Sequence, residues 1–160
     1  MRFLADGMLG RLARWLRILG HDTAYLTDAD DNTLIGLAAA EDRILLTGDR
    51  DLYKKSLMQG VNAFLVEPAD HMERLAGVAA RFSLRLEIDT ESPRCPRCNF
   101  PLRETPRQEV EGRIPSRSIT MSKSFWRCAG CGKLYWQGSH WKDIQGRLAY
   151  AKKAMPRIDA

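Results

Sequence analysis

The chain has 160 residues, of which 44% are hydrophobic and 28% charged, and this balance excludes a disordered or fibrous protein. The length predicts one domain, or one compact domain with a small module. No apolar run is long enough to span a bilayer, and the N-terminal stretch MRFLADG lacks the apolar segment of a secretory signal. We therefore expect a cytoplasmic protein with no membrane partner.

Charge is distributed unevenly along the chain. The net charge is +5, but residues 1–92 carry 11 Lys and Arg against 15 Asp and Glu, whereas residues 93–160 carry 14 against 5. A basic surface attracts polyanions through counterion release and long-range steering. The second part is therefore expected to face a nucleic acid. A basic surface that serves only solubility is the plainer alternative.

Strand and helix patterns alternate over the first 90 residues. Short apolar stretches predict strands at 2–5, 23–26, 44–46 and 63–66. Apolar residues at helical spacing predict helices at 8–19, 31–39, 51–58 and 70–82. This alternation favours a parallel sheet with helices on both faces. Asp31 is expected to cap the second helix, and the alternation of Leu84, Leu86 and Ile88 predicts an edge strand or an extended connector.

The composition changes near Ser92-Pro93, where Pro, Arg and Cys replace the apolar helices. We therefore expect two domains, one of residues 1–92 and one of residues 93–160. Residues 93–138 are typical of short strands and tight turns. A final helix is predicted to begin at Gly138-Ser139 and to pack on the first domain or on the second, through one face formed by Trp141, Ile144, Leu148 and Ala151.

Four cysteines form two C-x-x-C pairs, which are Cys95 with Cys98 and Cys128 with Cys131. Four thiolates are what a structural Zn²⁺ requires for a closed tetrahedral site, so the zinc would hold the fold and would not catalyse. The 29 residues between the pairs exceed the usual spacing of about 15–20, which predicts a longer hairpin between the two turns.

A redox site is the alternative for the first cysteine pair, because C-P-x-C also suits a thioredoxin-like protein. Such a site requires a strand before the pair and a helix after it. Pro93 precedes the pair and Asn99-Phe100-Pro101 follows it, so no helix can start there. The zinc interpretation is therefore favoured.

Acidic residues follow the first three predicted strands, as Asp6, then Asp28, Asp30 and Asp31, then Asp49 and Asp51. The carboxyl ends of parallel strands meet at one edge of a sheet, where ligands bind. Neighbouring carboxylates repel unless a cation lies between them, and oxygen ligands suit Mg²⁺ or Mn²⁺. The pattern predicts a metal site of Asp6, Asp31 and Asp49, with Asp51 as a candidate fourth ligand. The alternative is that each Asp only caps a helix.

Other catalytic patterns fit the sequence poorly. A haloacid-dehalogenase-like phosphatase needs Asp-x-Asp after its first strand, and this chain has Asp6-Gly7-Met8 there. No G-x-x-x-x-G-K-[ST] phosphate loop is present. The three histidines, His21, His71 and His140, are scattered and are interpreted as structural.

Several segments resemble the Mut-seven C-terminal ribonuclease family. They are DGMLGRLARWLR from Asp6, GHD from Gly20, RILLTGDRDL from Arg43, RCPRCN from Arg94 and the stretch from Cys128 to Trp141. The resemblance covers nearly the whole chain, with nuclease core and ribbon in order. It implies a PIN-like three-layer α/β domain with a parallel sheet of four or five strands, followed by a four-cysteine zinc ribbon and a final helix.

The resemblance also implies a site and an activity. The PIN-like pattern has acids after the first strand, at the start of the second helix and after the third strand, which correspond to Asp6, Asp31 and Asp49, with Asp51 as a fourth. Asp30 could replace Asp31, and Gly48 stands where a basic residue is expected. The implied activity is hydrolysis of RNA with one or two Mg²⁺ or Mn²⁺ ions, leaving a 5′-phosphate and a 3′-hydroxyl.

Basic and aromatic residues are candidates for contacts with single-stranded RNA. Arg11, Arg14 and Arg17 recur on the first predicted helix, and Arg50 follows the third strand. A merely solvated helix face is the alternative. In the ribbon, stacking on bases is expected from Trp126, Tyr135 and Trp136, although Trp136 also suits a small core. The rival function is a non-enzymatic RNA-binding adaptor, in which the ribbon binds RNA and the acids only cap helices.

Overall fold

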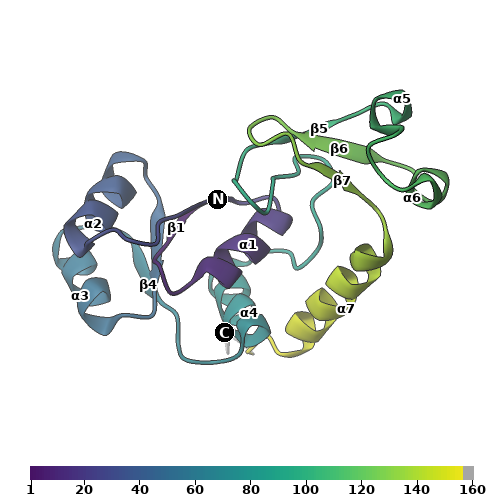
Figure 1. The fold of residues 1–160 in the computed structure, drawn as a ribbon. Helices are drawn as coiled ribbons and strands as arrows, with labels where there is room; N and C mark the ends of the chain where they lie inside the picture. Colours follow the sequence, from purple (N-terminus) through teal and green to yellow (C-terminus); the bar gives the residue numbers. More distant parts are fainter. Residues whose placement is uncertain (157–160) are drawn as a thin grey trace.

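Four parallel strands form the centre of the first part in the computed structural model, which describes residues 1–156 (Figure 1). The strands are β1 (Arg2–Ala5), β2 (Asp22–Tyr25), β3 (Ile44–Thr47) and β4 (Ala63–Leu65). Their order in the sheet is β2-β1-β3-β4, with every neighbouring pair parallel. The predicted parallel α/β arrangement is confirmed, and the carboxyl ends of β1 and β3 lie side by side at the middle of the sheet.

Helices cover both faces of this sheet (Figure 1). They are α1 (Gly10–Ile18), α2 (Asp31–Ala40), α3 (Arg50–Met58) and α4 (His71–Phe82). Alternate strand residues point to opposite faces, so Phe3 and Leu46 pack with α1 and α4. Leu4 and Leu45 pack with α2 and α3 in a second cluster. The sheet is therefore the buried middle of three layers.

One local expectation in this part needs correction, and one open choice between an edge strand and a connector is settled. Asp30, not Asp31, caps α2, because its backbone is still extended and its carboxylate accepts the Thr33 N–H at 2.7 Å, whereas Asp31 is already the first helical residue. Leu84 and Leu86 belong to a connector and not to a fifth strand. Both are buried in the core on the α1 and α4 side, which explains their apolar character without a strand.

The second part contains a three-stranded antiparallel sheet. Its strands are β5 (Leu102–Glu104), β6 (Phe125–Cys128) and β7 (Leu134–Trp136), in the order β5-β6-β7. The long connection before β6 holds two short helices, α5 (Arg107–Val110) and α6 (Ser116–Met121). These helices and the turn between them bury Val110, Ile114 and Ile119 against Phe125, so the extra length between the cysteine pairs forms a small core of its own.

The last helix, α7 (Ser139–Lys153), begins after Gly138 as predicted and returns to the first part of the chain (Figure 1). Leu148 and Ala151 are buried in the core that contains α1 and α4. The helix contacts both parts of the chain, because its later turns pack on α4 while Trp141 in its first turn stacks on Trp126 of β6. Within residues 1–156, none of the helices combines the length and apolar composition needed to cross a membrane.

Candidate functional site

Asp6 lies at the carboxyl end of β1 and is only 5% exposed. Its Oδ1 accepts the Met8 N–H at 2.9 Å, and its Oδ2 accepts the Gly48 N–H at 3.2 Å and the Thr47 hydroxyl. Hydrogen bonds to backbone of two different loops fix the carboxylate in one orientation. Asp6 is thus a rigid oxygen donor at the middle of the sheet edge.

Thr47, the last residue of β3, connects Asp6 with Asp49. Its fully buried hydroxyl donates to Asp6 and accepts the Asp49 N–H at 2.9 Å. Asp49 in turn caps α3, since its Oδ1 accepts the N–H groups of Asp51 at 2.7 Å and Leu52 at 3.2 Å. The strand ends of β1 and β3 are therefore joined through one side chain, and two candidate acids belong to one hydrogen-bonded group.

Asp31 and Asp51 occupy the first turns of α2 and α3, where Asp31 is half-buried and Asp51 is exposed. Because Asp30 supplies the cap of α2, the Asp31 carboxylate has no capping role. It instead forms an ion pair with the ammonium of Lys55 on α3, with 3.6 Å between Nζ and Oδ2. Its carboxylate therefore already faces one positive charge.

The acids share an edge but do not converge. Within residues 1–156, the four cysteines are the only group of three or more His, Cys, Asp or Glu whose donor atoms all lie within 4.8 Å of one another. Asp6 and Asp49 are linked through Thr47, whereas Asp31 is held by Lys55. The donor set has the hard-oxygen chemistry that Mg²⁺ and Mn²⁺ prefer, and the exposed side chains must rotate to share an ion.

The four arginines predicted to contact RNA lie in different environments. Arg11 and Arg14 are exposed on α1, and Arg50 is exposed at the start of α3, 3.8 Å from Glu67. Arg17 is different, because it is only 7% exposed. Its guanidinium donates to the carbonyls of Thr23 at 2.9 Å and of Pro96 and Arg97 at 3.2 Å. Arg17 therefore joins the two parts of the chain and is not on an RNA-facing surface.

The ribbon aromatics also have structural roles. Trp126 is 7% exposed and stacks on Trp141, with ring planes 2° apart and centroids 6.3 Å apart. Tyr135 places its hydroxyl 3.1 Å from Cys95 Sγ, and Trp136 packs against the small core around Val110. Each of the three rings thus has a contact inside the protein, Trp136 packs in the small core as its alternative role predicted, and stacking of these rings on RNA bases stays a prediction.

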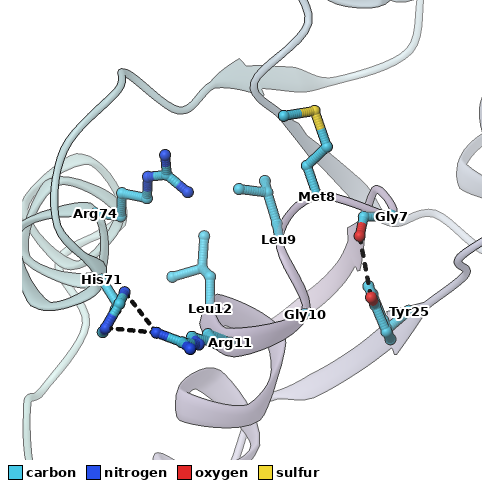
Figure 2. Close-up of a pocket in the computed structure, with 9 residues that line it drawn as sticks. All are labelled: Gly7, Met8, Leu9, Gly10, Arg11, Leu12, Tyr25, His71 and Arg74. Atoms are coloured by element: carbon cyan, nitrogen blue, oxygen red, sulfur yellow. Dashed lines mark hydrogen bonds between the residues drawn. The ribbon is translucent and has the colours of Figure 1, made fainter.

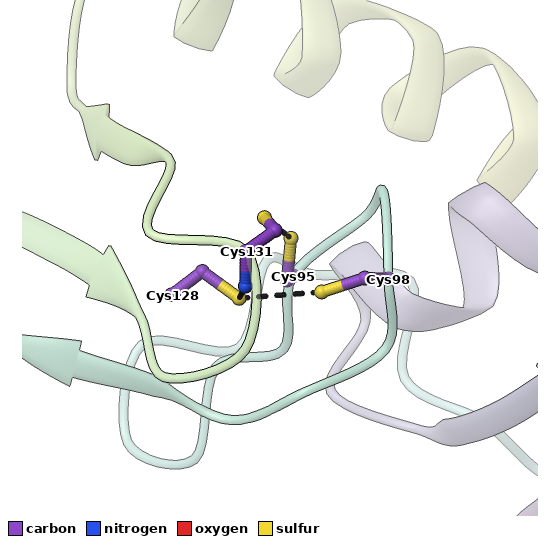
Figure 3. Close-up of side chains that lie close together, drawn as sticks. All are labelled: Cys95, Cys98, Cys128 and Cys131. Carbon is purple, nitrogen blue, oxygen red and sulfur yellow. Dashed lines mark hydrogen bonds between the residues drawn. The ribbon is translucent and has the colours of Figure 1, made fainter.

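The two C-x-x-C turns bring their sulfur atoms together (Figure 3). The Sγ atoms of Cys95 and Cys131 are 3.8 Å apart, and those of Cys98 and Cys128 are 3.3 Å apart. Four sulfurs around a tetrahedral zinc ion, with Zn–S bonds of about 2.3 Å, are separated by about 3.8 Å. The cluster could therefore hold a metal ion such as zinc.

Hydrogen-bond donors surround the cysteine sulfurs, although burial outweighs them at Cys128 and raises the pKa of that thiol to about 12. The N–H groups of Gly130 and Cys131 point at Cys128 Sγ, each at 3.4 Å. At Cys95, burial favours the neutral thiol, but the Tyr135 hydroxyl and backbone donors outweigh it and lower the pKa of Cys95 to about 7. Donors aimed at sulfur are what a metal-bound thiolate requires from its surroundings.

A family model for the Mut7-C RNAse domain matches residues 1–148, which include the acidic edge, all four cysteines and most of α7. The chain belongs to the Mut7-C RNAse domain family. The resemblance found in the sequence is therefore confirmed, and family membership indicates a ribonuclease whose substrate is RNA. No curated protein and no solved structure matched the chain.

Sequence reasoning missed two parts of this Mut7-C RNAse domain. Thr47 lies just beyond the strand predicted at 44–46, and its hydroxyl, directly before Gly48-Asp49, is a donor placed at the sheet edge. His71 was interpreted as structural, yet its ring lies in a pocket beside Arg11, with 2.9 Å between Nε2 and the guanidinium. Arg11 and His71 are 60 positions apart, so no spacing pattern in the sequence connects them.

Proposed function

We propose that the chain is a metal-dependent ribonuclease that hydrolyses phosphodiester bonds of single-stranded RNA at the edge formed by β1 and β3. Asp6, Asp31, Asp49 and Asp51 would hold one or two Mg²⁺ or Mn²⁺ ions. The observation that carries this proposal is the Thr47 hydroxyl, which joins Asp6 and Asp49 at neighbouring strand ends. A pair of acids that only capped helices would not need this connection.

Each residue of the edge has a distinct task in this proposal. Asp6 is a fixed ligand, because backbone N–H groups and Thr47 hold it. Asp49 keeps one oxygen for the cap of α3, and the half-buried Asp31 completes the site by leaving Lys55. A bound Mg²⁺ or Mn²⁺ ion lowers the pKa of a water molecule and neutralises charge that develops on the scissile phosphate.

The ribbon is proposed to bind a structural zinc ion through its four cysteines and to assist RNA binding by charge. Residues 93–160 carry the excess of positive charge, and Arg11, Arg14 and Arg50 are exposed on the first part. Phosphate contacts of this kind attract any RNA sequence and weaken with salt. We also propose that residues 1–92 form a PIN-like domain, because acidic residues follow three of its strands.

The decisive experiment compares two Asp→Asn variants with matched local roles. Asp49→Asn retains the cap of α3, because Asn is as good a cap as Asp, but it removes a charge at the edge. Asp89→Asn is the control, since Asp89 also accepts the N–H groups two and three residues later and lies outside the edge. Cleavage of single-stranded RNA with Mn²⁺ should fall by orders of magnitude only in Asp49→Asn.

The rival function, an RNA-binding adaptor without activity, makes a different prediction. Wild-type protein would bind RNA but leave it intact in Mg²⁺ and in Mn²⁺, and Asp49→Asn would change nothing. The comparison is best made with and without added Mn²⁺, because a chelator would also compete for the zinc ion. Products with 5′-phosphate and 3′-hydroxyl ends are expected if the nuclease proposal is right.

A further inference from the structure

A pocket of about 380 Å³ opens beside the acidic edge, between the loop after β1 and the start of α4 (Figure 2). Its wall is formed by Gly7, Met8, Leu9, Gly10, Arg11, Leu12, Tyr25, His71 and Arg74. The size lies within the range of about 300–1,000 Å³ typical of ligand pockets. Of the residues that line the pocket, only Arg11 was predicted from the sequence to contact RNA.

The polar side chains of this pocket are basic, apart from the hydroxyl of Tyr25. Arg11, His71 and Arg74 line it, and no Asp or Glu does. Among residues 1–156, neither Arg11 nor Arg74 has a carboxylate within ion-pair distance, although arginines elsewhere in the chain do. Two guanidinium groups without counter-charge favour an anionic ligand.

Arg74 carries a further sign that a partner is missing. Its Nε is buried and has no hydrogen-bond acceptor among the described residues. A buried donor without an acceptor costs free energy, and native structures rarely leave one unless a ligand or water completes it. Figure 2 shows the guanidinium of Arg74 extending from α4 toward the loop that contains Met8 and Leu9.

The pocket is built into the same loop that holds Asp6. The Met8 N–H donates to Asp6 at 2.9 Å, and the side chain of Met8 lines the pocket. On the other side, the Tyr25 hydroxyl donates to the Gly7 carbonyl at 3.0 Å. A ligand that contacts Arg11 and Arg74 would therefore lie next to the proposed catalytic edge.

We infer that this pocket binds one phosphate group of the substrate RNA, held by the guanidinium groups of Arg11 and Arg74 and by the ring of His71. Guanidinium groups match phosphate oxygens in two-point hydrogen bonds, and the apolar wall of Leu9 and Leu12 accepts the attached sugar or base. The pocket would fix the register of the RNA relative to Asp6. This inference rests on the proposed ribonuclease function for the identity of the ligand.

The test measures binding of a short fluorescent oligouridine to the full chain without added divalent ions, so that no cleavage is required. Arg74→Met and Arg11→Met should each weaken binding about tenfold. Each should also reduce the slope of log affinity against log salt by about 0.7, the value for one phosphate contact on a single strand. Arg81→Met is the control, because Arg81 is exposed on the same helix and outside the pocket.

Two versions of the oligonucleotide, one with a 5′-phosphate and one with a 5′-hydroxyl, distinguish a terminal phosphate from an internal one. If the pocket holds a 5′-terminal phosphate, removing that phosphate weakens binding to the wild-type chain as much as Arg74→Met does. The Arg74→Met variant then binds the oligonucleotides with and without the 5′-phosphate equally. If it holds an internal phosphate, both oligonucleotides bind equally and lose equally in the variant. Either pattern supports the inference and names the ligand.

The inference is overturned if Arg11→Met and Arg74→Met both bind with the affinity and salt slope of Arg81→Met. Arg11 is exposed, so its variant remains informative even if Arg74→Met folds poorly. The proposed function fails in a different way, by absence of cleavage in Mn²⁺ while binding responds to the pocket variants. The two failures are therefore distinguishable.

Discussion

The Asn99 side chain is hydrogen-bonded to Asp22, with 2.7 Å between Nδ2 and Oδ1, and its own Oδ1 accepts the Thr23 N–H at 3.0 Å. Asn99 directly follows Cys98, so the first cysteine turn is attached to the free edge of β2. Asp22 is also paired with Arg43 at 2.8 Å. Arg94, one residue before Cys95, lies 3.8 Å from the same carboxylate. The polar contacts of Asn99 and Arg94 thus join the first cysteine turn to the edge of the sheet, and we expect a change in that turn to affect β2.

Replacing Asn99 by Gly should lower the free energy of unfolding by about 2 kcal/mol, because a hydrogen bond to a charged group and one to a backbone N–H are lost. Gly is the right substitution, since Asn99 has a φ of 70° that a larger residue would find strained. Urea unfolding with bound zinc measures the change. Asn62→Gly is the control, because Asn62 is exposed in a loop and controls for the added chain flexibility. Equal effects of the two substitutions would contradict the role given to Asn99.

Removing a sulfur ligand should affect both the ribbon and β2. Purified, reduced wild-type protein should contain about one zinc ion per chain, and Cys128→Ser should lose it. Amide exchange is then expected to become fast between residues 94 and 138. Faster exchange is also expected at the Thr23 N–H, whose acceptor is Asn99. Protein without zinc, or a Thr23 amide that stays protected in Cys128→Ser, would show that the expected coupling is wrong.

Asp30 and Asp31 should separate stability from activity. Asp30→Ala removes the cap of α2 and is expected to cost about 1 kcal/mol of stability while cleavage continues. Asp31→Asn should leave the helix intact and abolish Mn²⁺-dependent cleavage, since only the charge at the edge changes. Chemical unfolding and an RNA cleavage assay on both variants give the two readouts. If Asp30→Ala abolishes cleavage and Asp31→Asn does not, Asp30 is the metal ligand instead of Asp31.

His21 makes stability depend on pH. Burial, together with the nearby N-terminal ammonium, lowers the pKa of His21 from 6.5 to about 4 in the folded chain. Between these values the unfolded chain binds a proton that the folded chain does not, so the free energy of unfolding falls as the pH decreases from 6.5 toward 4. Urea unfolding across this range should show a smaller decrease in His21→Phe than in wild type. Parallel decreases in both proteins would assign the acid sensitivity of this pH range to groups other than His21.

Burial of Asp22 would by itself raise its pKa, but hydrogen bonds from Arg43 and Asn99 outweigh it and lower the pKa to about 2. Stability from Asp22 is therefore present above its ordinary pKa of 3.8 and is lost as the pH falls through about 2. The two groups act in neighbouring pH windows, which allows the His21 measurement to be separated from the effect of Asp22.

The sequence was sufficient for the layers and for the acidic edge, because apolar period and strand-end position are local properties. Asp6 and Asp49 follow predicted strands, and sheet order alone then places them side by side. The cap of α2 was misassigned by one residue, since neighbouring Asp30 and Asp31 have the same capping chemistry and only backbone angles distinguish them. His71 and Arg74 required the packing of α4 on α1, which no local pattern encodes.

The environment of Arg17 shows a further limit of pattern reasoning. Arg11, Arg14 and Arg17 are spaced by three, but each step of three turns the helix about 60° short of a full circle. Arg17 has therefore rotated about 120° from Arg11, toward the buried side. Its charge is retained there because carbonyls accept its N–H groups, although burial lowers its pKa.

Arg17→Met should therefore destabilise the folded chain by about 3 kcal/mol, because hydrogen bonds from a charged group to Thr23, Pro96 and Arg97 are lost together. Arg14→Met is the matched control and should change stability by less than about 0.5 kcal/mol, since Arg14 is exposed on the same helix. For RNA binding, Arg14→Met should have the larger effect of the two substitutions. Under conditions where both variants are folded, Arg14→Met should reduce the salt dependence of RNA affinity and Arg17→Met should leave it unchanged. A stable Arg17→Met that loses RNA affinity as Arg14→Met does would return Arg17 to the RNA-binding surface.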